Sequence, residues 1–346
     1  MIRTIFLLVS MAASHPSSAA LVNTGFVYHP DYLLHDAGVG HPERAGRLEA
    51  IMTHLESRGL DKSLRLITPQ AVSNEWLLEV HSARHVEAVR AASRDAPTQL
   101  DPDTRMSRDS FHVAKLAAGG TLAAVDAVMA GQVANAFAAV RPPGHHALPD
   151  RAMGFCLFNN VAVGARYVQR RYGVERVLIV DWDVHHGNGT QDIFYNDSTV
   201  LYFSTHQYPY YPGTGSAGET GAGAGKGATI NAPLMAGAGD REIIEAFRQL
   251  LIPAVDNFRP QFVFISAGFD AHKDDPLAHL QVTEAGYQAL TRIVLELAER
   301  YAQGRVVSVL EGGYDLGALA RSVTAHIEEL MTHGQSKTPT DHTRRD

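Results

Sequence analysis

Two hydrophobic patterns alternate along the chain. Short continuous apolar runs, rich in valine and isoleucine, are typical of strands buried on both faces of a sheet. These predicted strands cover residues 25–28, a short stretch from 67, 136–140, 177–180, 199–204, 261–266 and 305–310. Segments with apolar residues at helical spacing cover 42–58, 75–80, 81–92, 111–130, 160–171, 240–258, 283–301 and 316–331. The alternation predicts an α/β fold with a mainly parallel central sheet flanked by helices on both faces.

The organisation of the chain is predicted to be simple. No internal repeat, linker or change of composition divides residues 24–331, so this segment is interpreted as a single domain. Polar residues 97–108 are expected to form a surface loop that rims a cleft. Residues 1–23 combine a charged start, an apolar run and small residues, which fits either a secretory signal peptide or an unstructured extension. Polar residues 332–346 are expected to form a C-terminal tail.

Composition narrows the classes of function. Of 346 residues, 45% are hydrophobic and 19% are charged, which suits a globular enzyme with a sizeable core. The net charge is −7 and no basic run exceeds a dipeptide, so direct nucleic-acid binding is not expected. No apolar segment is long enough to predict a membrane-spanning helix. The one cysteine, Cys156, excludes an intramolecular disulfide and a cysteine-rich zinc site, while 18 histidines favour a metal or acid–base site.

Polar side chains with catalytic potential follow four of the predicted strands. In open parallel sheets, the carboxyl ends of the strands form the edge at which ligands bind. Because four strands direct such residues to this edge, we expect a functional site there. The residues are His145 and His146 after 136–140, Asp181, Asp183 and His185 after 177–180, Asp270 after 261–266, and Tyr314 after 305–310.

Asp183, His185 and Asp270 form a predicted metal site. Alternate residues of an extended segment share a face, so Asp183 and His185 point the same way. Two carboxylates and one imidazole suit a catalytic zinc ion, because three protein ligands leave one coordination position for water or substrate. By itself, Asp270 would be interpreted as a loop residue that caps a turn.

His145, His146 and Tyr314 are the candidates for catalysis. The two histidines follow a rigid Pro-Pro-Gly segment, and adjacent histidines suit acid–base or electrostatic roles beside a metal. Each would need a partner that orients its second ring nitrogen, for which Asp181 and Asn188 are available. Tyr314 follows two glycines and could donate a hydrogen bond to a developing oxyanion.

Other catalytic motifs are absent or occur in the wrong context. Residues 213–218 match G-x-G-x-x-G but do not lie between a strand and a helix, so they are interpreted as a shaped loop rather than a nucleotide site. Neither a P-loop nor a G-x-S-x-G motif occurs. Cys156 lies between two large apolar residues and is interpreted as part of the core.

Five motifs closely resemble those of the zinc-dependent histone deacetylase superfamily, which includes bacterial histone deacetylase-like amidohydrolases and acetylpolyamine amidohydrolases. They are RPPGHH at 141–146, GFCLFNN at 154–160, DWDVHHGNGT at 181–190, SAGFD at 266–270 and EGGY at 311–314. The resemblance extends in order from residue 25 to residue 331 and implies the arginase–deacetylase fold. Asn188 and the Asp-Pro-Leu segment that ends at Leu277 are more similar to class II members.

The resemblance implies a role for each residue of the predicted site. The three predicted ligands would hold one zinc ion per chain. His146, oriented by Asn188, would be the general base and then the general acid. His145, oriented by Asp181, would act mainly electrostatically, and Tyr314 would polarise the amide carbonyl.

The resemblance also implies a substrate tunnel and a second cation. The carbonyl of Gly154 would accept the substrate N–H, and Phe155 and Tyr211 would line a tunnel for an apolar, lysine-like stem. Leu277 would occupy the position at the tunnel mouth, here called the gate. Tyr211 stands where the family often has phenylalanine. A potassium ion would be held, partly through backbone carbonyls, by Asp181, Asp183, His185, Ser204 and Thr205.

The function expected from this resemblance is a zinc-dependent amidohydrolase that removes acetyl or other short acyl groups from acylated lysine-type amines, using a metal-activated water molecule. The alternative is an acetylpolyamine amidohydrolase. Leu277 argues against it, because cationic polyamines favour an acid at the gate, although Asp101 and Asp103 could supply charge at the rim.

Two further functions are disfavoured. The residues supply ligands for one metal only, which argues against a two-metal ureohydrolase. No ligand or catalytic residue is missing, which argues against a silent acyl-lysine-binding protein. The resemblance implies a cytoplasmic location, whereas a true signal peptide at 1–23 would imply a periplasmic or secreted protein.

Overall fold

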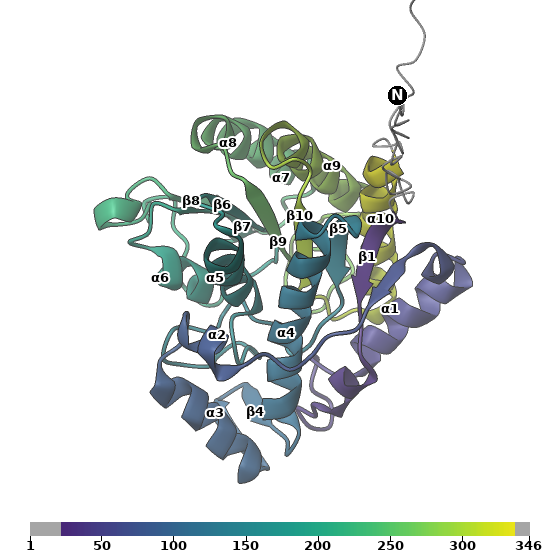
Figure 1. The fold of residues 1–346 in the computed structure, drawn as a ribbon, viewed down its shortest axis with the longest axis vertical. Coiled ribbons are helices and arrows are strands. Elements are labelled where there is room, and N and C mark those ends of the chain that lie inside the picture. The colour runs from purple at the N-terminus through teal and green to yellow at the C-terminus, as the bar shows by residue number, and fades with distance from the viewer. Residues whose placement is uncertain (1–21, 336–346) are drawn as a thin grey trace, which may run out of the picture.

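The computed structural model describes residues 22–335 of the chain. An eight-stranded sheet lies at the centre of this part (Figure 1). Its strand order is β2-β1-β5-β10-β9-β6-β7-β8, and all neighbouring strands are parallel. The predicted α/β fold with a parallel central sheet is therefore confirmed. The strands are β1 (Val22–Val27), β2 (Arg65–Ile67), β5 (Val133–Ala138), β6 (Val177–Asp181), β7 (Val200–Gln207), β8 (Thr229–Leu234), β9 (Phe262–Ala267) and β10 (Val306–Leu310).

Helices cover both faces of the sheet (Figure 1). On one face, α4 and α5 pack on the strands, and α2 and α3 pack on these two helices. On the other face, α10 packs on β1 and β5 and is flanked by α1 and α9. The helices are α1 (Gly46–Ser57), α2 (Asn74–Leu78), α3 (Ala83–Arg94), α4 (Ser110–Met129), α5 (Asn160–Tyr172), α6 (Asn188–Phe194), α7 (Asp240–Ala246), α8 (Ile252–Phe258), α9 (Glu284–Tyr301) and α10 (Leu316–Gln335), with a π-helical turn (Phe247–Leu251) between α7 and α8.

Helix α4 lies in the core of the molecule. Among the described residues it is the one helix with the length and apolar character to cross a membrane, but 72% of its apolar stretch is buried. A helix that is apolar on all sides is expected where other elements surround it. Its small residues allow close packing, because a Cβ atom at Gly119 would lie 1.7 Å from the carbonyl oxygen of Gln70.

The prediction of a surface loop at residues 97–108 was wrong. This segment contains an antiparallel hairpin of β3 (Thr98–Asp101) and β4 (Thr104–Met106). In β4 the burial alternates, with Arg105 exposed between two buried neighbours. A three-residue strand is too short for this alternation to be recognised in the sequence. The strands were missed because each is stabilised by pairing with the other, which a local sequence pattern does not show.

Other boundaries also differ from the prediction. Helix α1 begins at Gly46 rather than at residue 42, because the side chain of Glu43 is buried against Arg141 instead of facing solvent. Strand β8 was not predicted, since it contains Pro233, which an edge strand tolerates. Helix α6 was also missed, and α10 continues beyond residue 331 to Gln335. Residues 1–21 and 336–346, which include the possible signal peptide and most of the tail, lie outside the described residues.

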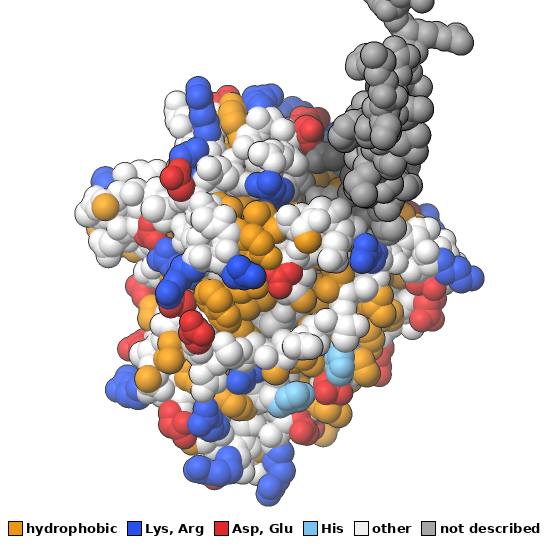
Figure 2. Space-filling view, viewed as in Figure 1, with side chains coloured by type: hydrophobic (Ala, Val, Ile, Leu, Met, Phe, Trp, Pro, Cys, Tyr) orange, Lys and Arg blue, Asp and Glu red, His pale blue; other side chains and the backbone are white. Residues whose placement is uncertain are grey.

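Lys and Arg side chains are interspersed with Asp and Glu side chains on the face of the molecule in Figure 2. Hydrophobic side chains are visible between them on the same face. No broad area of positive charge occurs among the described residues of this face.

Candidate active site

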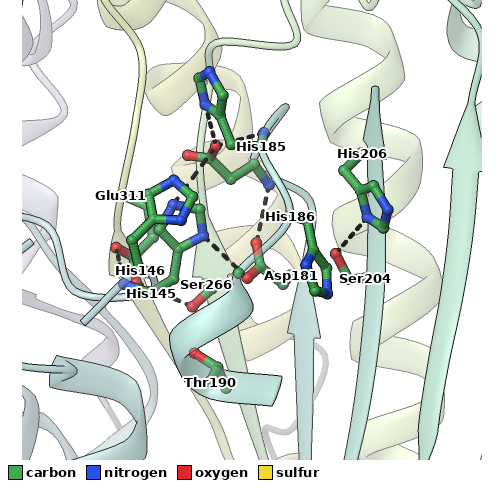
Figure 3. A network of polar contacts seen from close by, with 12 residues as sticks. His145, His146, Asp181, His185, His186, Thr190, Ser204, His206, Ser266 and Glu311 are labelled. Atoms are coloured by element: carbon green, nitrogen blue, oxygen red, sulfur yellow. Dashed lines mark hydrogen bonds and ion pairs between the residues drawn. The ribbon is translucent and has the colours of Figure 1, made fainter. Parts of the chain in front are cut away.

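The predicted site residues converge at one edge of the sheet. The strands β5, β10, β9 and β6 are consecutive neighbours, so the loops that follow their carboxyl ends lie side by side. Figure 3 shows His145, His146, Asp181 and His185 close together. The order of the strands in the sheet therefore brings the predicted residues together at the edge where the site was expected.

The three predicted metal ligands face one another. Their ligand atoms all lie within 4.8 Å of one another. The Nδ1 atom of His185 is 3.1 Å from Oδ1 of Asp183 and 3.2 Å from Oδ2 of Asp270. The backbone N–H of Gly312 donates to Oδ2 of Asp183 at 2.8 Å, and that of Val184 donates to Oδ1 of Asp270 at 2.9 Å. Backbone donors thus hold both carboxylates in place.

The electrostatics of this triad suit a cation. The Oδ2 atom of Asp270 is buried, and its polar contact among the described residues is the ion pair with His185. Burial, and then the charge of Asp183, raise the pKa of Asp270 to about 7. Burial alone would lower the pKa of His185, but hydrogen bonds to Asp183 and Asp270 raise it to about 10. The two carboxylates therefore attract positive charge, and two oxygens with one imidazole nitrogen form a donor set that Zn²⁺ accepts.

His145 lies behind the ligands in a charged environment. Its Nδ1 atom is 3.2 Å from Oδ2 of Asp181, and its Nε2 atom is 3.8 Å from Oδ1 of Asp183. Burial alone would lower the pKa of His145, but Asp183 and then Asp181 raise it to about 10. The hydroxyl of Tyr202 also donates to Asp181, at 3.0 Å. The two carboxylates therefore favour the charged form of the His145 imidazole.

His146 is the uncharged member of the pair. Its Nδ1 atom is 2.7 Å from Oδ1 of Asn188. Because a carbonyl oxygen can only accept, the hydrogen-bond network assigns the ring proton to Nδ1 and leaves a lone pair on Nε2. Burial, and then the charges of His145 and His185, lower the pKa of His146 well below its ordinary value. The ring lines the cavity described below, so an unprotonated nitrogen is available there.

Glu311 supports the histidine pair and was not predicted. The side chain is fully buried. Its Oε2 atom accepts the backbone N–H groups of Gly144 at 2.6 Å and His145 at 3.1 Å, and its Oε1 atom accepts the hydroxyl of Ser266 at 3.0 Å. Figure 3 shows Glu311 beside both histidines. The EGGY motif contains this residue, but no sequence pattern indicated which loop it would contact.

A cavity of about 230 Å³ leads to this cluster. It brings together all four residues predicted to bind substrate. The ring centroids of Tyr211 and His146 are 5.2 Å apart, and those of Phe155 and Tyr314 are 5.8 Å apart. Gly154 has a φ of 56°, and a Cβ atom there would lie 2.4 Å from Cδ2 of His146, so only glycine fits. The lining residues are Asp103, His146, Gly154, Phe155, His185, Tyr210, Tyr211, Leu277 and Tyr314.

Tyr210 is a lining residue that the sequence did not indicate. Its hydroxyl donates to the backbone carbonyl of Leu277. Its ring lies parallel to the imidazole of His185, with centroids 5.9 Å apart. Asp103, which was predicted only for the rim, lines the cavity from the β3–β4 hairpin. The only signal in the sequence was that Tyr210 precedes Tyr211, which was predicted to line the tunnel. This position did not indicate that the Tyr210 ring lines the cavity as well.

Tyr314 faces the cavity from the loop between β10 and α10. The guanidinium carbon of Arg47 lies 5.0 Å from the centroid of its ring. Burial raises the pKa of the Tyr314 hydroxyl well above its ordinary value, so the group stays protonated. A protonated hydroxyl in this position is a hydrogen-bond donor.

A buried ion pair fixes the loop that carries the histidines. The guanidinium of Arg141 donates to both carboxylate oxygens of Glu43 at 2.8 Å. It also donates to the backbone carbonyls of Tyr32 at 2.7 Å and His35 at 2.8 Å. Burial raises the pKa of Glu43, but the charge and hydrogen bonds of Arg141 outweigh this and lower it to about 2. The pair links the start of the PPGHH loop to the segment before α1.

Replacing Glu43 with glutamine is expected to destabilise the protein by about 3–5 kcal/mol, because the buried guanidinium of Arg141 loses its partner. The pKa of Glu43 is lower in the folded protein, so the stabilisation is complete above its ordinary value of 4.5 and is lost as the pH falls toward 2. Denaturant unfolding should give a smaller difference between wild type and variant at pH 3 than at pH 7. The exposed Glu49 provides a matched control, Glu49→Gln, and an equal loss in both variants would contradict the assignment.

His186 lies outside the ligand set, as predicted. Its Nδ1 atom is 2.8 Å from the hydroxyl of Thr214, and its Nε2 atom is 3.0 Å from Oε1 of Gln191. Figure 3 shows it on the side of Ser204 and His206. The His186 side chain therefore contacts the glycine-rich loop through Thr214. In the same loop Gly215 packs closely on His206, because a Cβ atom at Gly215 would lie 2.4 Å from Nε2 of His206.

Two of the residues predicted for potassium, Asp183 and His185, also belong to the predicted ligand set. Asp181 and Ser204 are paired in the register of β6 and β7. The hydroxyl of Ser204 contacts Nδ1 of His206 at 2.9 Å, so its own side chain has a partner. The hydroxyl of Thr205 is buried and has no hydrogen-bond partner.

Comparison with known proteins places the chain in a family. The histone deacetylase domain family matches residues 41–330. A probable deacetylase of Archaeoglobus fulgidus is 45% identical over 299 residues, covering 86% of this chain and 83% of that protein. A histone deacetylase-like amidohydrolase of Pseudomonas aeruginosa is 41% identical over 319 residues, covering 92% of this chain and 82% of that protein. The crystal structure of the HDA15 HD domain has a TM-score of 0.86 and 41% identity, covering 92% of this chain and 90% of that chain.

The matched segment contains every predicted ligand, catalytic and substrate-binding residue described above. It also contains seven of the eight parallel strands in full. Sequence, fold and site agree, and the chain belongs to the histone deacetylase family of amide-hydrolysing deacetylases.

Proposed function

We propose that this deacetylase depends on one zinc ion per chain and removes acetyl or other short acyl groups from lysine-type amines. The observation that carries the proposal is the arrangement at the end of the cavity. There, Asp183, His185 and Asp270 lie beside the uncharged His146 and the protonated Tyr314. When bound by these ligands, zinc would polarise an amide carbonyl and lower the pKa of a water molecule to about 7.

The side chains of the protein would carry out the proton transfers. The Nε2 atom of His146 takes a proton from the attacking water, because Asn188 keeps the other nitrogen protonated. The hydroxyl of Tyr314 donates to the oxygen of the former carbonyl as it gains charge. His146 then gives its proton to the leaving nitrogen, which releases a carboxylate and a free amine. His145, charged beside Asp181, contributes electrostatically.

The cavity suits an acylated amine on a narrow apolar stem. Phe155 and Tyr211 provide aromatic walls, and the carbonyl of Gly154 accepts the substrate N–H. Leu277 occupies the gate. An acetylated lysine side chain matches this combination of apolar walls and one backbone acceptor.

We also propose that potassium binds behind the site through Asp181, Asp183, His185, Ser204 and Thr205. The unpartnered, buried hydroxyl of Thr205 supports this assignment. The buried carboxylate of Asp181 supplies negative charge nearby.

The proposed partner is the acylated substrate alone. No direct nucleic-acid binding is proposed, which is consistent with the net charge of −7 and with the mixed charges on the face in Figure 2. No membrane association is proposed, and a cytoplasmic location is proposed on the family resemblance.

A side-by-side assay tests the proposed function. Metal-stripped protein is given an acetyl-lysine peptide or an acetylated polyamine, before and after one equivalent of zinc is added. We expect zinc to restore hydrolysis, with the peptide as the better substrate. Hydrolysis that does not respond to zinc would reject metal dependence, and a preference for the polyamine would select the alternative substrate class.

Replacing Leu277 with glutamate is expected to shift the ratio of kcat/KM values toward acetylated polyamines by about tenfold, which corresponds to about 1.4 kcal/mol. The new carboxylate would face the cavity and attract the second ammonium group of a polyamine. Leu277→Gln has the same length without the charge and is the control. If both variants have the same ratio, the charge at this position does not control selectivity.

A further inference from the structure

The carboxylate of Asp275 connects the gate of the cavity to the candidate catalytic tyrosine. Its Oδ1 atom accepts the backbone N–H of Leu277 at 3.0 Å. Its Oδ2 atom accepts the backbone N–H of Tyr314 at 2.7 Å and that of Asp315 at 3.3 Å. One side chain thus holds two segments that lie far apart in the sequence and line the same cavity.

The gate is held from a second direction as well. The carbonyl of Leu277 accepts the hydroxyl of Tyr210, whose ring lies parallel to the imidazole of the predicted ligand His185. A continuous series of contacts therefore surrounds the cavity, from His185 through Tyr210, Leu277 and Asp275 to Tyr314. The Asp275 carboxylate is the link in this series between Leu277 and Tyr314.

Side chains from other segments hold the backbone around Tyr314: Nε of Arg47 donates to the carbonyl of Gly313 at 2.7 Å, and Asp275 accepts the next two N–H groups. Two glycines precede Tyr314, and Gly313 has a φ of 121°, which residues with a side chain rarely adopt. The side chain of Asp275, which accepts the N–H groups of Tyr314 and Asp315, is only 7% exposed. Water therefore replaces these bonds poorly if the carboxylate is removed, and the position of the phenol depends on them.

We propose that Asp275 is a positioning residue that sets the place of the Tyr314 hydroxyl relative to a substrate held at the gate. This inference rests on the proposed role of Tyr314 in polarising the carbonyl. The hydrogen bonds that the carboxylate of Asp275 accepts come from the backbone of Leu277, Tyr314 and Asp315 and not from a predicted metal ligand. Asp275 acts through the backbone of Tyr314 on one side and of Leu277 on the other.

Asp275→Asn is the direct test, because it keeps the size of the side chain but turns one acceptor oxygen into a donor. We expect kcat for an acetyl-lysine peptide to fall about 10–100-fold, since a displacement of about 1 Å has effects of this order. Zinc content should stay at the wild-type level. The neighbouring Asp274 is half exposed and contacts Arg321, so Asp274→Asn is the same chemical change outside the cavity and should leave kcat within about twofold.

Two further measurements separate positioning from a general loss of structure. A trifluoroacetyl-lysine peptide has a more electrophilic carbonyl, which needs less help from Tyr314, so Asp275→Asn should cost at least fivefold less with this substrate than with acetyl-lysine. In a Tyr314→Phe background, Asp275→Asn should lower kcat by less than about threefold, because the hydroxyl that it positions is already absent.

Equal losses with both substrates, or full additivity with Tyr314→Phe, would overturn the inference. A kcat for Asp275→Asn within twofold of wild type would also overturn it. If Asp275→Asn does not fold, Asp275→Glu keeps the charge, shifts the carboxylate by one methylene and must show the same substrate dependence. Inactive zinc-loaded wild-type protein would instead reject the proposed function, which is a different outcome from an active wild type with an unaffected variant.

Discussion

Replacing Asp183 with alanine is expected to eliminate stoichiometric zinc binding and to reduce turnover to the background rate. The variant removes one of three ligands and leaves Asp270 and His185 without the charge that completes the set. Loss of a residue that merely orients a ligand costs about 10–100-fold in affinity or activity, and loss of a ligand itself should exceed this. Zinc content by elemental analysis and kcat on an acetyl-lysine peptide are the two measurements.

Asp192→Ala is a suitable control for this variant. Asp192 is an exposed residue of α6, so its removal tests the effect of losing one carboxylate that is not part of the ligand set. The control should bind one zinc ion and retain wild-type turnover. Full zinc occupancy in Asp183→Ala would remove this residue from the ligand set.

Replacing Tyr314 with phenylalanine is expected to lower kcat by about 10²–10³-fold, the usual effect of removing one donor to an oxyanion. The change deletes a single hydroxyl, which burial keeps protonated. The ring stays in place between Phe155 and the guanidinium of Arg47, so KM and zinc content should change little. An interaction made only in the transition state affects kcat and kcat/KM equally.

Tyr301→Phe provides the comparison for Tyr314→Phe. The hydroxyl of Tyr301 donates to Asp256 at 2.8 Å, in a contact between α9 and α8. Its loss should leave kcat unchanged. Turnover of Tyr314→Phe equal to wild type would exclude the phenol from the mechanism, whereas a rise in KM alone would assign it to substrate binding.

The main features of the site follow from local sequence patterns. A buried apolar run that ends in Asp183 and His185 predicts both a strand and the residues at its carboxyl end, and the run before Asp270 does the same. Because the strands are parallel, these ends meet at one edge of the sheet. The pairing of His146 with Asn188 was also within reach, since both residues belong to motifs that resemble those of one family.

The supporting residues were much harder to predict. Glu43 was predicted to lie in the first turn of a helix, yet its side chain is buried against Arg141, which is 98 positions away. The hairpin that carries Asp103 was interpreted as a loop because its strands are short and polar outside. Glu311 stood in a recognised motif, but its contact with Gly144 spans 167 positions.

The sequence by itself determined most of the strands and helices, apart from β3, β4, β8 and α6, and which polar residues leave the strands at their carboxyl ends. These properties depend on periodicity and turn residues, which act over a few positions. The tertiary structure decided how close Asp183 comes to Asp270 and how Asp275 connects Leu277 to Tyr314. Such distances result from the packing of loops that are remote in sequence, and many small contacts determine them together. For that reason, the sequence predicted candidate ligands and catalytic residues that the structure brings together, whereas the residues that hold them in place could not be predicted.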